Sequence, residues 1–238
     1  MGLFSGIFSK RKPIDLAGIT DWHSHILPGV DDGVEDIDTS LAILDDYEKA
    51  GVTNVWLTPH IMEDIPNTTD QLRERFKQLS DAYTGSIKLH LAAENMMDAL
   101  FEERLNAGDL LPIGSAGKTL LVETSYYTPP LHLEDIFEEI KSKGFNPLLA
   151  HPERYCYIDS LKRYKRLKDM GVRFQLNILS LAGAYGPGPQ KKSVDMLRLG
   201  MYDAYGSDLH RHHQFGQIQS IALSSTIHDH LRQINPTL

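Results

Sequence analysis

Short apolar runs alternate along the chain with longer segments in which apolar positions recur every three or four residues. The short runs are typical of buried strands, and the longer segments are typical of helices with one apolar face. Strands are predicted at residues 19–23, 52–57, 87–93, 119–123, 147–150, 173–176 and 204–206. Helices are predicted at residues 38–50, 69–83, 98–107, 133–143, 160–170, 191–199 and about 217–233. This alternation indicates βα units, and therefore an α/β fold with a parallel sheet or barrel.

The connections between these elements have recognisable turn chemistry. Four predicted helices are followed directly by glycine, as is common where a helix turns into the next strand: Gly51, Gly144, Gly171 and Gly200. The segment 181–190 contains GAYGPGP and is predicted to be an irregular surface loop near the mouth of a site. A chain of 238 residues can bury one substantial core. We therefore predict a single domain over residues 18–238, preceded by an extension of residues 1–17.

Composition narrows the class of protein. The hydrophobic fraction of 41% and the charged fraction of 24% are ordinary for a soluble globular enzyme, and no run is long enough to cross a bilayer. A net charge of −8 disfavours a non-specific nucleic-acid binder, because the chain would be repelled by phosphate backbones. The single cysteine, Cys156, excludes an intramolecular disulfide and fits a reducing compartment, so a cytoplasmic location is expected.

The first thirteen residues, MGLFSGIFSKRKP, place an apolar patch before a basic one. A secretory signal has the opposite order, and N-myristoylation requires Ser or Thr where this chain has Gly6. The segment is therefore predicted to be a mobile tail or a short helix packed on the body. The alternative is weak contact with a membrane surface or a partner through four apolar side chains, Leu3, Phe4, Ile7 and Phe8.

Side chains that bind metal ions follow most of the predicted strands. They are His23, His25, His60, Glu94, Glu123, His151, Asp208 and His210. In a parallel barrel the carboxyl ends of all strands meet at one face, so we expect these side chains to lie close together. Imidazole and carboxylate suit Mn, Fe and Zn, and carboxylates can bridge two ions. The sequence therefore predicts a site for several divalent metal ions.

Each of these residues has a simpler alternative when it is taken alone. A single histidine is more often a hydrogen-bonded structural residue, and Glu94 or Glu123 could be a helix cap or half of a salt bridge. A carboxylate that ends an apolar strand is nevertheless costly to bury unless it is paired or binds a metal. The spacing of two residues between His23 and His25 recurs between Asp208 and His210, and this recurrence favours the metal site.

The strings that contain these residues resemble a known family. HSHILPGVDDG runs from His23 to Gly33, and TPH, AAEN, VET, AHPER and SDLH follow in that order. As a set they resemble the PHP (polymerase and histidinol phosphatase) superfamily. The opening string and AHPERY resemble the CpsB/YwqE-type bacterial protein-tyrosine phosphatases in particular. The resemblance covers residues 19 to 215, roughly.

The resemblance implies a distorted TIM-like (β/α)7 barrel with three divalent metal ions, Mn being expected and Fe or Zn the alternatives. It implies that one ion is held by His23, His25, Glu94 and Asp208, a second by Glu94, Glu123 and His151, and the third by Asp32, His60 and His210. Asp31 could replace Asp32 in this assignment. Asp32 is preferred because it directly precedes Gly33.

The resemblance also suggests which residues handle the phosphate. Arg154 matches the arginine of the HPER string, and its planar guanidinium suits phosphate oxygens. A further basic residue is expected in the loop after SDLH. Arg211 occupies that place, facing either the phosphate or solvent, and His212 and His213 are predicted to lie in a solvated loop. The expected mechanism is direct attack by a metal-bridging hydroxide, with Asp208 or a metal-bound water as the acid.

A thiol mechanism would need Cys-x5-Arg, and the chain has Lys162 at the position of that arginine. The resemblance implies a phosphotyrosine phosphatase acting on a protein, expected to be the tail of an autophosphorylated bacterial tyrosine kinase in a capsule or exopolysaccharide system. The alternatives are a histidinol-phosphate phosphatase or other small-molecule PHP phosphoesterase, an amidohydrolase, and a metal-free scaffold or regulatory binding protein. Amidohydrolases usually carry a carboxylated lysine, and here Glu94 and Glu123 stand at those strand ends.

Overall fold

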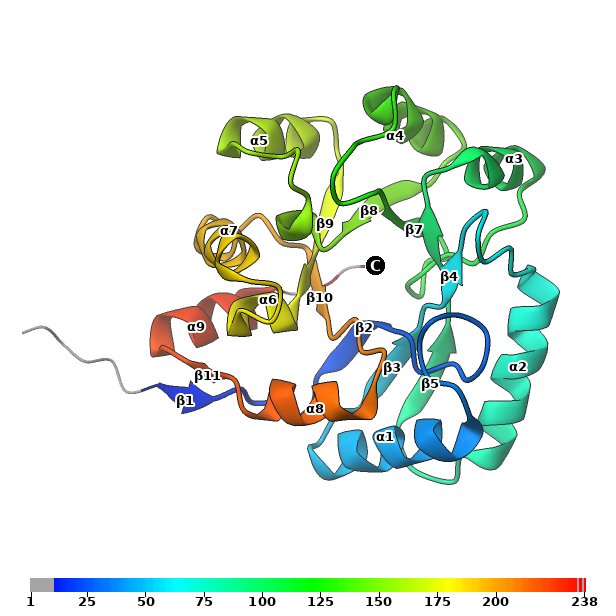
Figure 1. Ribbon diagram of the computed structural model, residues 1–238, viewed down its shortest axis with the longest axis vertical. Coiled ribbons are helices and arrows are strands. Elements are labelled where there is room, and N and C mark those ends of the chain that lie inside the picture. The colour runs from blue at the N-terminus through cyan, green and yellow to red at the C-terminus, as the bar shows by residue number, and fades with distance from the viewer. Residues whose placement is uncertain (1–10, 235, 237) are drawn as a thin grey trace, which may run out of the picture.

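Parallel strands form a curled sheet whose outer side is covered by helices (Figure 1). The computed structural model describes residues 11–234, 236 and 238. Its strands are β1 (Lys12–Pro13), β2 (Thr20–Ser24), β3 (Asn54–Leu57), β4 (His60–Ile61), β5 (Lys88–Leu91), β6 (Glu94–Met96), β7 (Thr119–Glu123), β8 (Asn146–Ala150), β9 (Arg173–Asn177), β10 (Ala204–Gly206) and β11 (Ala222–Leu223).

The strands pair in two parallel sheets that adjoin each other. One sheet has the order β10-β9-β8-β7-β6-β4 and the other has the order β2-β3-β5. They meet between β2 and β10, where Ser24 forms a parallel bridge with Leu209 and the amide of Asp208 donates to the carbonyl of His23 at 2.8 Å. The predicted α/β fold with a curled parallel sheet is therefore confirmed.

Helices connect successive strands and form the outer ring that Figure 1 shows. They are α1 (Ile37–Lys49), α2 (Thr69–Ala82), α3 (Ala99–Ala107), α4 (Leu133–Ser142), α5 (Leu161–Asp169), α6 (Ile178–Ala182), α7 (Pro187–Arg198), α8 (His212–Gln219) and α9 (Ser225–Gln233), with a short 3-10 turn η1 (Pro152–Arg154). Side-chain caps fix several helix starts, and the Asp36 carboxylate accepts from the amide of Thr39 at 2.7 Å. The glycines predicted to end helices do so with positive φ, for example 86° at Gly51.

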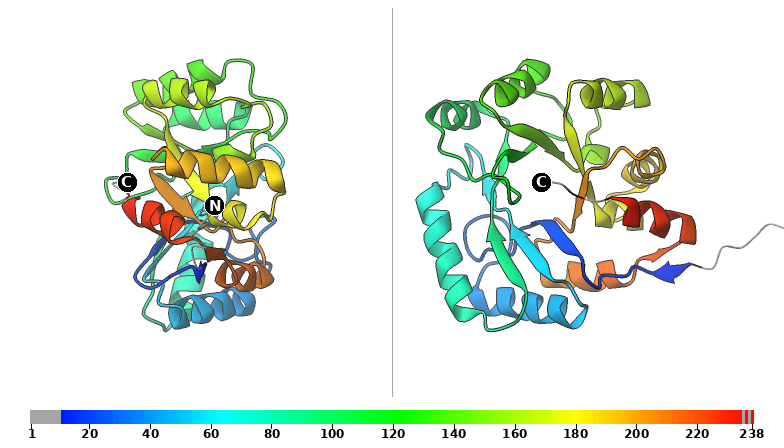
Figure 2. Two further views of the ribbon diagram at one scale, coloured as in Figure 1. Left: turned by 90° about the vertical axis from the view of Figure 1, so that its left-hand side faces the viewer. Right: turned by 180° about the vertical axis from the view of Figure 1, so that it is seen from behind.

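The apolar faces of these helices pack against the outer side of the sheet and form a continuous core. A smaller cluster fills the space inside the strands, where Leu238 packs with Trp56 and Ile113. Leu238 lies at the amino end of the strands, because its carbonyl accepts from the amide of Ser115 at 3.2 Å and Ile113 bridges to the first residue of β7. Figure 2 shows this chain end at one edge of the fold. None of the described helices is long and apolar enough to span a bilayer.

Three expectations about the second half of the chain are wrong. The segment 181–190 is not irregular throughout, because α7 begins at Pro187, and proline suits the first position of a helix. Residues 217–233 do not form one helix either. Helices α8 and α9 are separated by β11, and His212 and His213 begin α8 instead of lying in a loop.

The start of the described chain is attached to the body through β1, which pairs antiparallel with β11 in the register Lys12 to Leu223. The expectations for Leu3, Phe4, Ile7 and Phe8 concern residues outside the described part of the chain. The division into an extension of residues 1–17 and a domain of residues 18–238 stays a prediction.

Candidate metal centre

The predicted ligand residues come together at the carboxyl ends of the parallel strands. His23 lies in β2, His60 begins β4, Glu94 begins β6 and Glu123 ends β7. The others lie in the loops that follow β2, β8 and β10, and they are His25, Asp32, His151, Asp208 and His210. Most of these side chains are buried, whereas Asp32 is 64% exposed. The cluster therefore has a buried floor and one side that is open to solvent.

The floor is formed by His23, His25, Glu94 and Asp208. The Nε2 atoms of the two histidines lie 3.1 Å apart. Both nitrogens also lie 3.1–3.2 Å from Oε2 of Glu94 and 3.4 Å from Oδ1 of Asp208. Four donor atoms that converge in this way, two of them imidazole nitrogens facing each other, match the ligand set of one divalent cation.

Two further groups share residues with the floor. Nδ1 of His60 lies 3.2 Å from both Oε2 of Glu94 and Oε1 of Glu123. Nε2 of His151 lies 3.0 Å from Glu94 and 3.7 Å from Glu123. On the open side, Asp32 lies 3.6 Å from Nε2 of His60. The structure thus brings all nine predicted ligands into one cluster. The donor atoms that converge in the second group are those of His60, Glu94 and Glu123, and His151 lies beside the other oxygen of Glu94.

His210 completes the open side of the cluster, with its Nε2 3.5 Å from Asp32. The imidazole of His25 stacks on that of His210 with a centroid distance of 3.9 Å, so this third group contains one more histidine than expected.

The polar atoms of the cluster fit a bound cation. Oε2 of Glu94 and Nδ1 of His60 are buried and make no hydrogen bond, which is costly for groups of this kind. Burial alone would lower the pKa of both His23 and His60. Neighbouring carboxylates outweigh burial: Glu94 and Asp208 raise the pKa of His23 to about 9, and Glu123 and Glu94 raise that of His60 to about 10. The centre is therefore strongly attractive to positive charge.

Residues behind the cluster hold the imidazoles in place. Oδ2 of Asp31 lies 2.7 Å from Nδ1 of His25, and Oε1 of Gln175 lies 3.1 Å from Nδ1 of His23. These acceptors favour a proton on Nδ1, so Nε2 of each ring is the nitrogen that faces the floor and can bind a metal ion once it carries no proton. Asp31 thus stands behind His25 while Asp32 faces the open side, and the choice of Asp32 as the ligand stays a prediction.

The sequence analysis missed this supporting set. Gln175 and Asn177 are polar residues at alternate positions of the buried strand β9, and that pattern could have marked them. Asn177 donates from Nδ2 to Oδ2 of Asp208 at 2.9 Å. It also donates to the hydroxyl of Tyr185 at 3.1 Å, so one amide connects the cluster to a residue at its rim.

The backbone is unusual at three points of the centre. His151 with φ of 32° and Asp208 with φ of 51° are the non-glycine residues with positive φ in the described part of the chain. Such conformations are sparsely populated and are found where the surroundings impose them. A Cβ on Gly33 would lie 2.3 Å from the carbonyl oxygen of His25, so only glycine fits there. These features position the loops that carry the ligands.

Arg154 lies at the rim, at the end of η1. Its Nη1 donates to Oδ2 of Asp208 at 2.8 Å. The guanidinium lies between the rings of Tyr126 and Tyr185, 4.3 Å and 4.1 Å from their centroids. Both faces of the guanidinium are therefore covered, and its remaining N–H groups are available only along its edge. Nothing in the sequence distinguished these two tyrosines from others.

The remaining candidates lie farther out. Nη1 of Arg211 donates to the carbonyl oxygen of Asp32, and to those of Gly33 at 2.6 Å and His210 at 3.0 Å, so it supports the Asp32 loop. His212 contacts Asp46 at 2.9 Å, away from the cluster. Cys156 is exposed. A phosphate-binding role for Arg211 stays a prediction.

The fold and this centre define an α/β protein with a candidate multi-metal site at the carboxyl ends of a curled parallel sheet. The family model for "Capsular polysaccharide synthesis, CpsB/CapC" matches residues 19–219, and the chain belongs to this family. The resemblance inferred from the ligand-bearing strings is thereby confirmed.

Relatives and a solved structure agree with this placement. The chain is 27% identical over 198 residues to the "Putative tyrosine-protein phosphatase CapC" of Staphylococcus aureus, covering 81% of this chain and 77% of that protein. It is 28% identical over 195 residues to the "Tyrosine-protein phosphatase YwqE" of Bacillus subtilis (strain 168), covering 80% and 76%. One similar solved structure is described as "YwqE from Bacillus subtilis and CpsB from Streptococcus pneumoniae, unique metal-dependent tyrosine phosphatases". It superimposes on this chain with a TM-score of 0.76 at 22% identity and covers 92% of this chain and 96% of that one. This likeness supports the fold.

Proposed function

We propose that this protein is a metal-dependent phosphatase that hydrolyses phosphotyrosine on proteins. One observation carries the proposal: Glu94 lies within 3.2 Å of four histidines, while the guanidinium of Arg154 lies beside the same cluster. A centre for cations next to a fixed guanidinium suits a phosphate monoester. These relatives are named as tyrosine-protein phosphatases, which supports the same substrate class.

In this proposal nine residues hold three divalent ions, with Mn as the expected metal. They are His23, His25, Asp32, His60, Glu94, Glu123, His151, Asp208 and His210. When bound, such ions polarise phosphoryl oxygens and lower the pKa of water. Glu94 is the shared ligand, because its two oxygens face different histidines. His23 and His60 must give up a proton to bind, since the metal-free cluster raises their pKa values.

The side chains at the rim bind and orient the phosphate. Arg154 donates to non-bridging oxygens, and Tyr126 and Tyr185 keep its guanidinium in one plane. Burial opposes ionisation of Asp208, but His23 and other histidines hold its pKa below the usual range. Asp208 therefore acts as a ligand and as the partner of Arg154 and not as a proton donor. Tyrosine phenolate leaves readily, so the reaction needs little acid assistance.

The same proposal includes the barrel type, the domain bounds, the cellular location, the substrate and the role of Arg211. If β3 with β4, and β5 with β6, each count as one interrupted strand, the sheet corresponds to the (β/α)7 barrel of the PHP type. The catalytic domain spans residues 18–238, the protein acts in the cytoplasm, and its substrate is the tail of a bacterial tyrosine kinase. Arg211 is a second phosphate-facing residue.

The proposal is tested by comparing substrates on one preparation. Protein supplied with Mn²⁺ is assayed with a phosphotyrosine peptide, p-nitrophenyl phosphate and histidinol phosphate, and Glu94→Gln serves as the control for contaminating phosphatases. We expect turnover of both aryl phosphates and little of histidinol phosphate. Preference for histidinol phosphate would assign the small-molecule alternative. No turnover of any ester by metal-loaded protein would favour a binding protein.

A further inference from the structure

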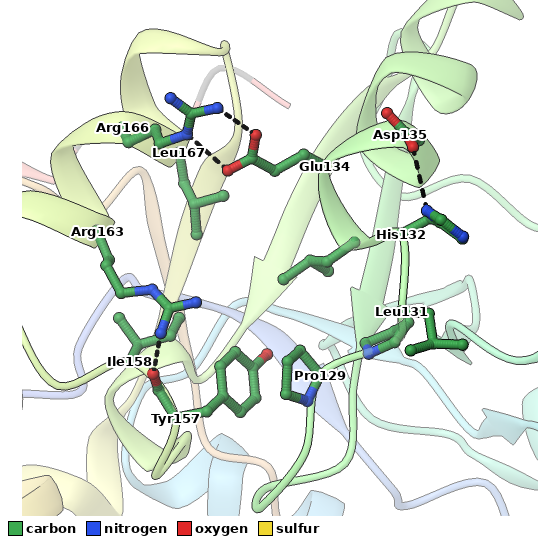
Figure 3. A pocket seen from close by; sticks show the side chains of 12 residues that line it. Pro129, Leu131, His132, Glu134, Asp135, Tyr157, Ile158, Arg163, Arg166 and Leu167 are labelled. Carbon is green, nitrogen blue, oxygen red and sulfur yellow. Dashed lines mark hydrogen bonds and ion pairs between the residues drawn. The ribbon is translucent and has the colours of Figure 1, made fainter.

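A groove of about 380 Å³ lies between the loop after β7 and helix α5 (Figure 3). Residues Pro129 to Asp135 form one wall, and Tyr157, Ile158, Arg163, Arg166 and Leu167 form the other. We refer to it as the α4–α5 groove. Its walls belong to the segments that follow β7 and β8, so it opens at the same end of the sheet as the metal centre.

Tyr157 joins this groove to the centre. Its hydroxyl is 2.6 Å from Oγ1 of Thr124, the residue after Glu123. Its ring contacts that of Tyr155 at 5.4 Å between centroids, and Tyr155 contacts His151 at 5.8 Å. Two such steps correspond to roughly three or four residues of extended chain. A peptide with its phosphotyrosine at the centre could therefore place flanking residues in the groove.

Helix α5 gives the groove a basic wall in an acidic protein. It carries five cations and one acid, Asp169, whereas the whole chain has a net charge of −8. Lys162 and Arg163 lie in the first turn, where cations oppose the helix dipole, so they do not stabilise the helix. Arg163 donates to the carbonyl of Tyr157 at 2.7 Å, which holds its guanidinium against the groove. Of the two arginines that line the groove, Arg166 pairs with Glu134, and the lining His132 pairs with Asp135 on the opposite wall.

The opposite rim exposes apolar surface. Leu131 is 96% exposed and Tyr127 is 79% exposed, although large apolar side chains elsewhere in the described chain are mostly buried. The buried residues of α5 are Tyr164 and Leu167, and the rest of its surface is charged except for Leu161, which is 43% exposed. A face of this kind suits a polar polypeptide more than insertion into a membrane.

We propose that the α4–α5 groove docks an acidic segment next to the phosphotyrosine of the protein substrate. Acidic side chains would pair with Arg163 and with Lys162 and Lys165, and would compete with Glu134 for Arg166. Apolar side chains of the same segment would cover Leu131. The inference rests on the proposed function, because it assigns the part of the substrate that the metal centre does not contact.

The test compares two phosphotyrosine peptides that differ only in flanking Asp/Glu or Asn/Gln, together with p-nitrophenyl phosphate. Arg163→Gln combined with Arg166→Gln should lower kcat/KM for the acidic peptide about tenfold, through KM, since exposed ion pairs contribute modestly each. The neutral peptide and the small ester should change by less than about twofold. Lys77→Gln is the matched control, since Lys77 is 68% exposed, pairs with Asp81 and belongs to α2, which lies far from α5 in Figure 1.

Lys162→Glu combined with Lys165→Glu provides a second variant that leaves the groove wall intact, and it should weaken the acidic peptide by a similar factor. The preference for the acidic peptide should also decline as salt is raised. Equal loss on all three substrates, or no loss on the acidic peptide, would overturn the inference. So would binding to anionic vesicles that these substitutions abolish while peptide turnover is unchanged. Failure of the wild type on p-nitrophenyl phosphate would instead reject the proposed phosphatase activity.

Discussion

The floor of the metal centre and the rim around it are built in different ways. The floor residues lie in strands or one or two residues beyond them, and acceptors such as Asp31 and Gln175 fix the orientation of their rings. The rim consists of Arg154, Arg211 and the α4–α5 groove, which lie in loops and helix starts. A rigid floor determines which chemistry is available, whereas loops can change what is recognised without disturbing it. Substitutions at the floor should therefore change metal binding, whereas substitutions at the rim should change turnover or substrate preference.

The largest effect is expected at the floor. Glu94→Ala removes the carboxylate that faces four histidines and should release metal, so activity should fall by more than the roughly 10²–10³-fold typical of losing one charge-stabilising donor. Metal content and turnover are measured on the same sample. Glu138→Ala, which removes a carboxylate on α4 that is 58% exposed, is the control and should keep its metal. Full metal content in Glu94→Ala would contradict the shared-ligand role.

A smaller effect is expected at the rim. Arg154→Ala should lower turnover of aryl phosphates by about 10²–10³-fold, because a donor to developing negative charge is lost. Its metal content should equal that of the wild type, and Arg154→Lys should recover only part of the rate, since a point charge cannot replace the planar fork. If Arg154→Ala loses metal as His151→Ala is expected to, the arginine is structural.

Removing one of the two aromatic rings that contact Arg154 should lower turnover less than removing Arg154 itself. Tyr126→Ala removes one of two ring contacts and should reduce kcat roughly tenfold, in line with a partly buried cation–π contact. Tyr126→Phe keeps the ring and should be nearly normal. A Phe variant as slow as the Ala variant would show that the hydroxyl, and not the ring, is what acts.

The smallest expected effect is the release of protons when the cluster binds metal. Because the metal-free cluster raises the pKa of His23 to about 9 and of His60 to about 10, both are protonated near pH 7.5 and must lose a proton to bind metal. Binding of Mn²⁺ should therefore release about one or two protons per chain at pH 7.5, and the release should decline as pH rises through 9 to 10. Calorimetry in buffers of different ionisation enthalpy measures it. Release that is independent of pH would contradict these pKa values.

The sequence predicted the floor well, since metal-binding residue types stood at the ends of apolar runs and parallel strands bring such ends together. The expected position of Arg154 beside the cluster came from the resemblance of AHPER to the family's HPER string. The sequence could not predict that Tyr126 and Tyr185 lie beside Arg154, because these contacts depend on loops that are far apart along the chain. The acceptor Gln175 was missed although its position in β9 was informative.

The errors in the predicted helices of the second half of the chain had local causes. The apolar period continues through residues 217–233, which hid the break between α8 and α9. There the pairing of β11 with β1 overrides helical propensity. The prolines of segment 181–190 led to the prediction of irregular backbone there, but Pro187 is the first residue of helix α7. Helix starts and strand pairing of this kind depend on tertiary contacts that a periodic pattern does not contain.

The central claim is that this cluster binds the metal ions on which phosphotyrosine hydrolysis depends. Its most direct test is to strip the protein with a chelator, titrate Mn²⁺ back, and follow bound metal and hydrolysis of a phosphotyrosine peptide together. The account predicts that activity disappears with the metal and returns in step with binding, reaching its maximum at two to three ions per chain. Full activity in the stripped protein, or saturable binding without any return of activity, would contradict it.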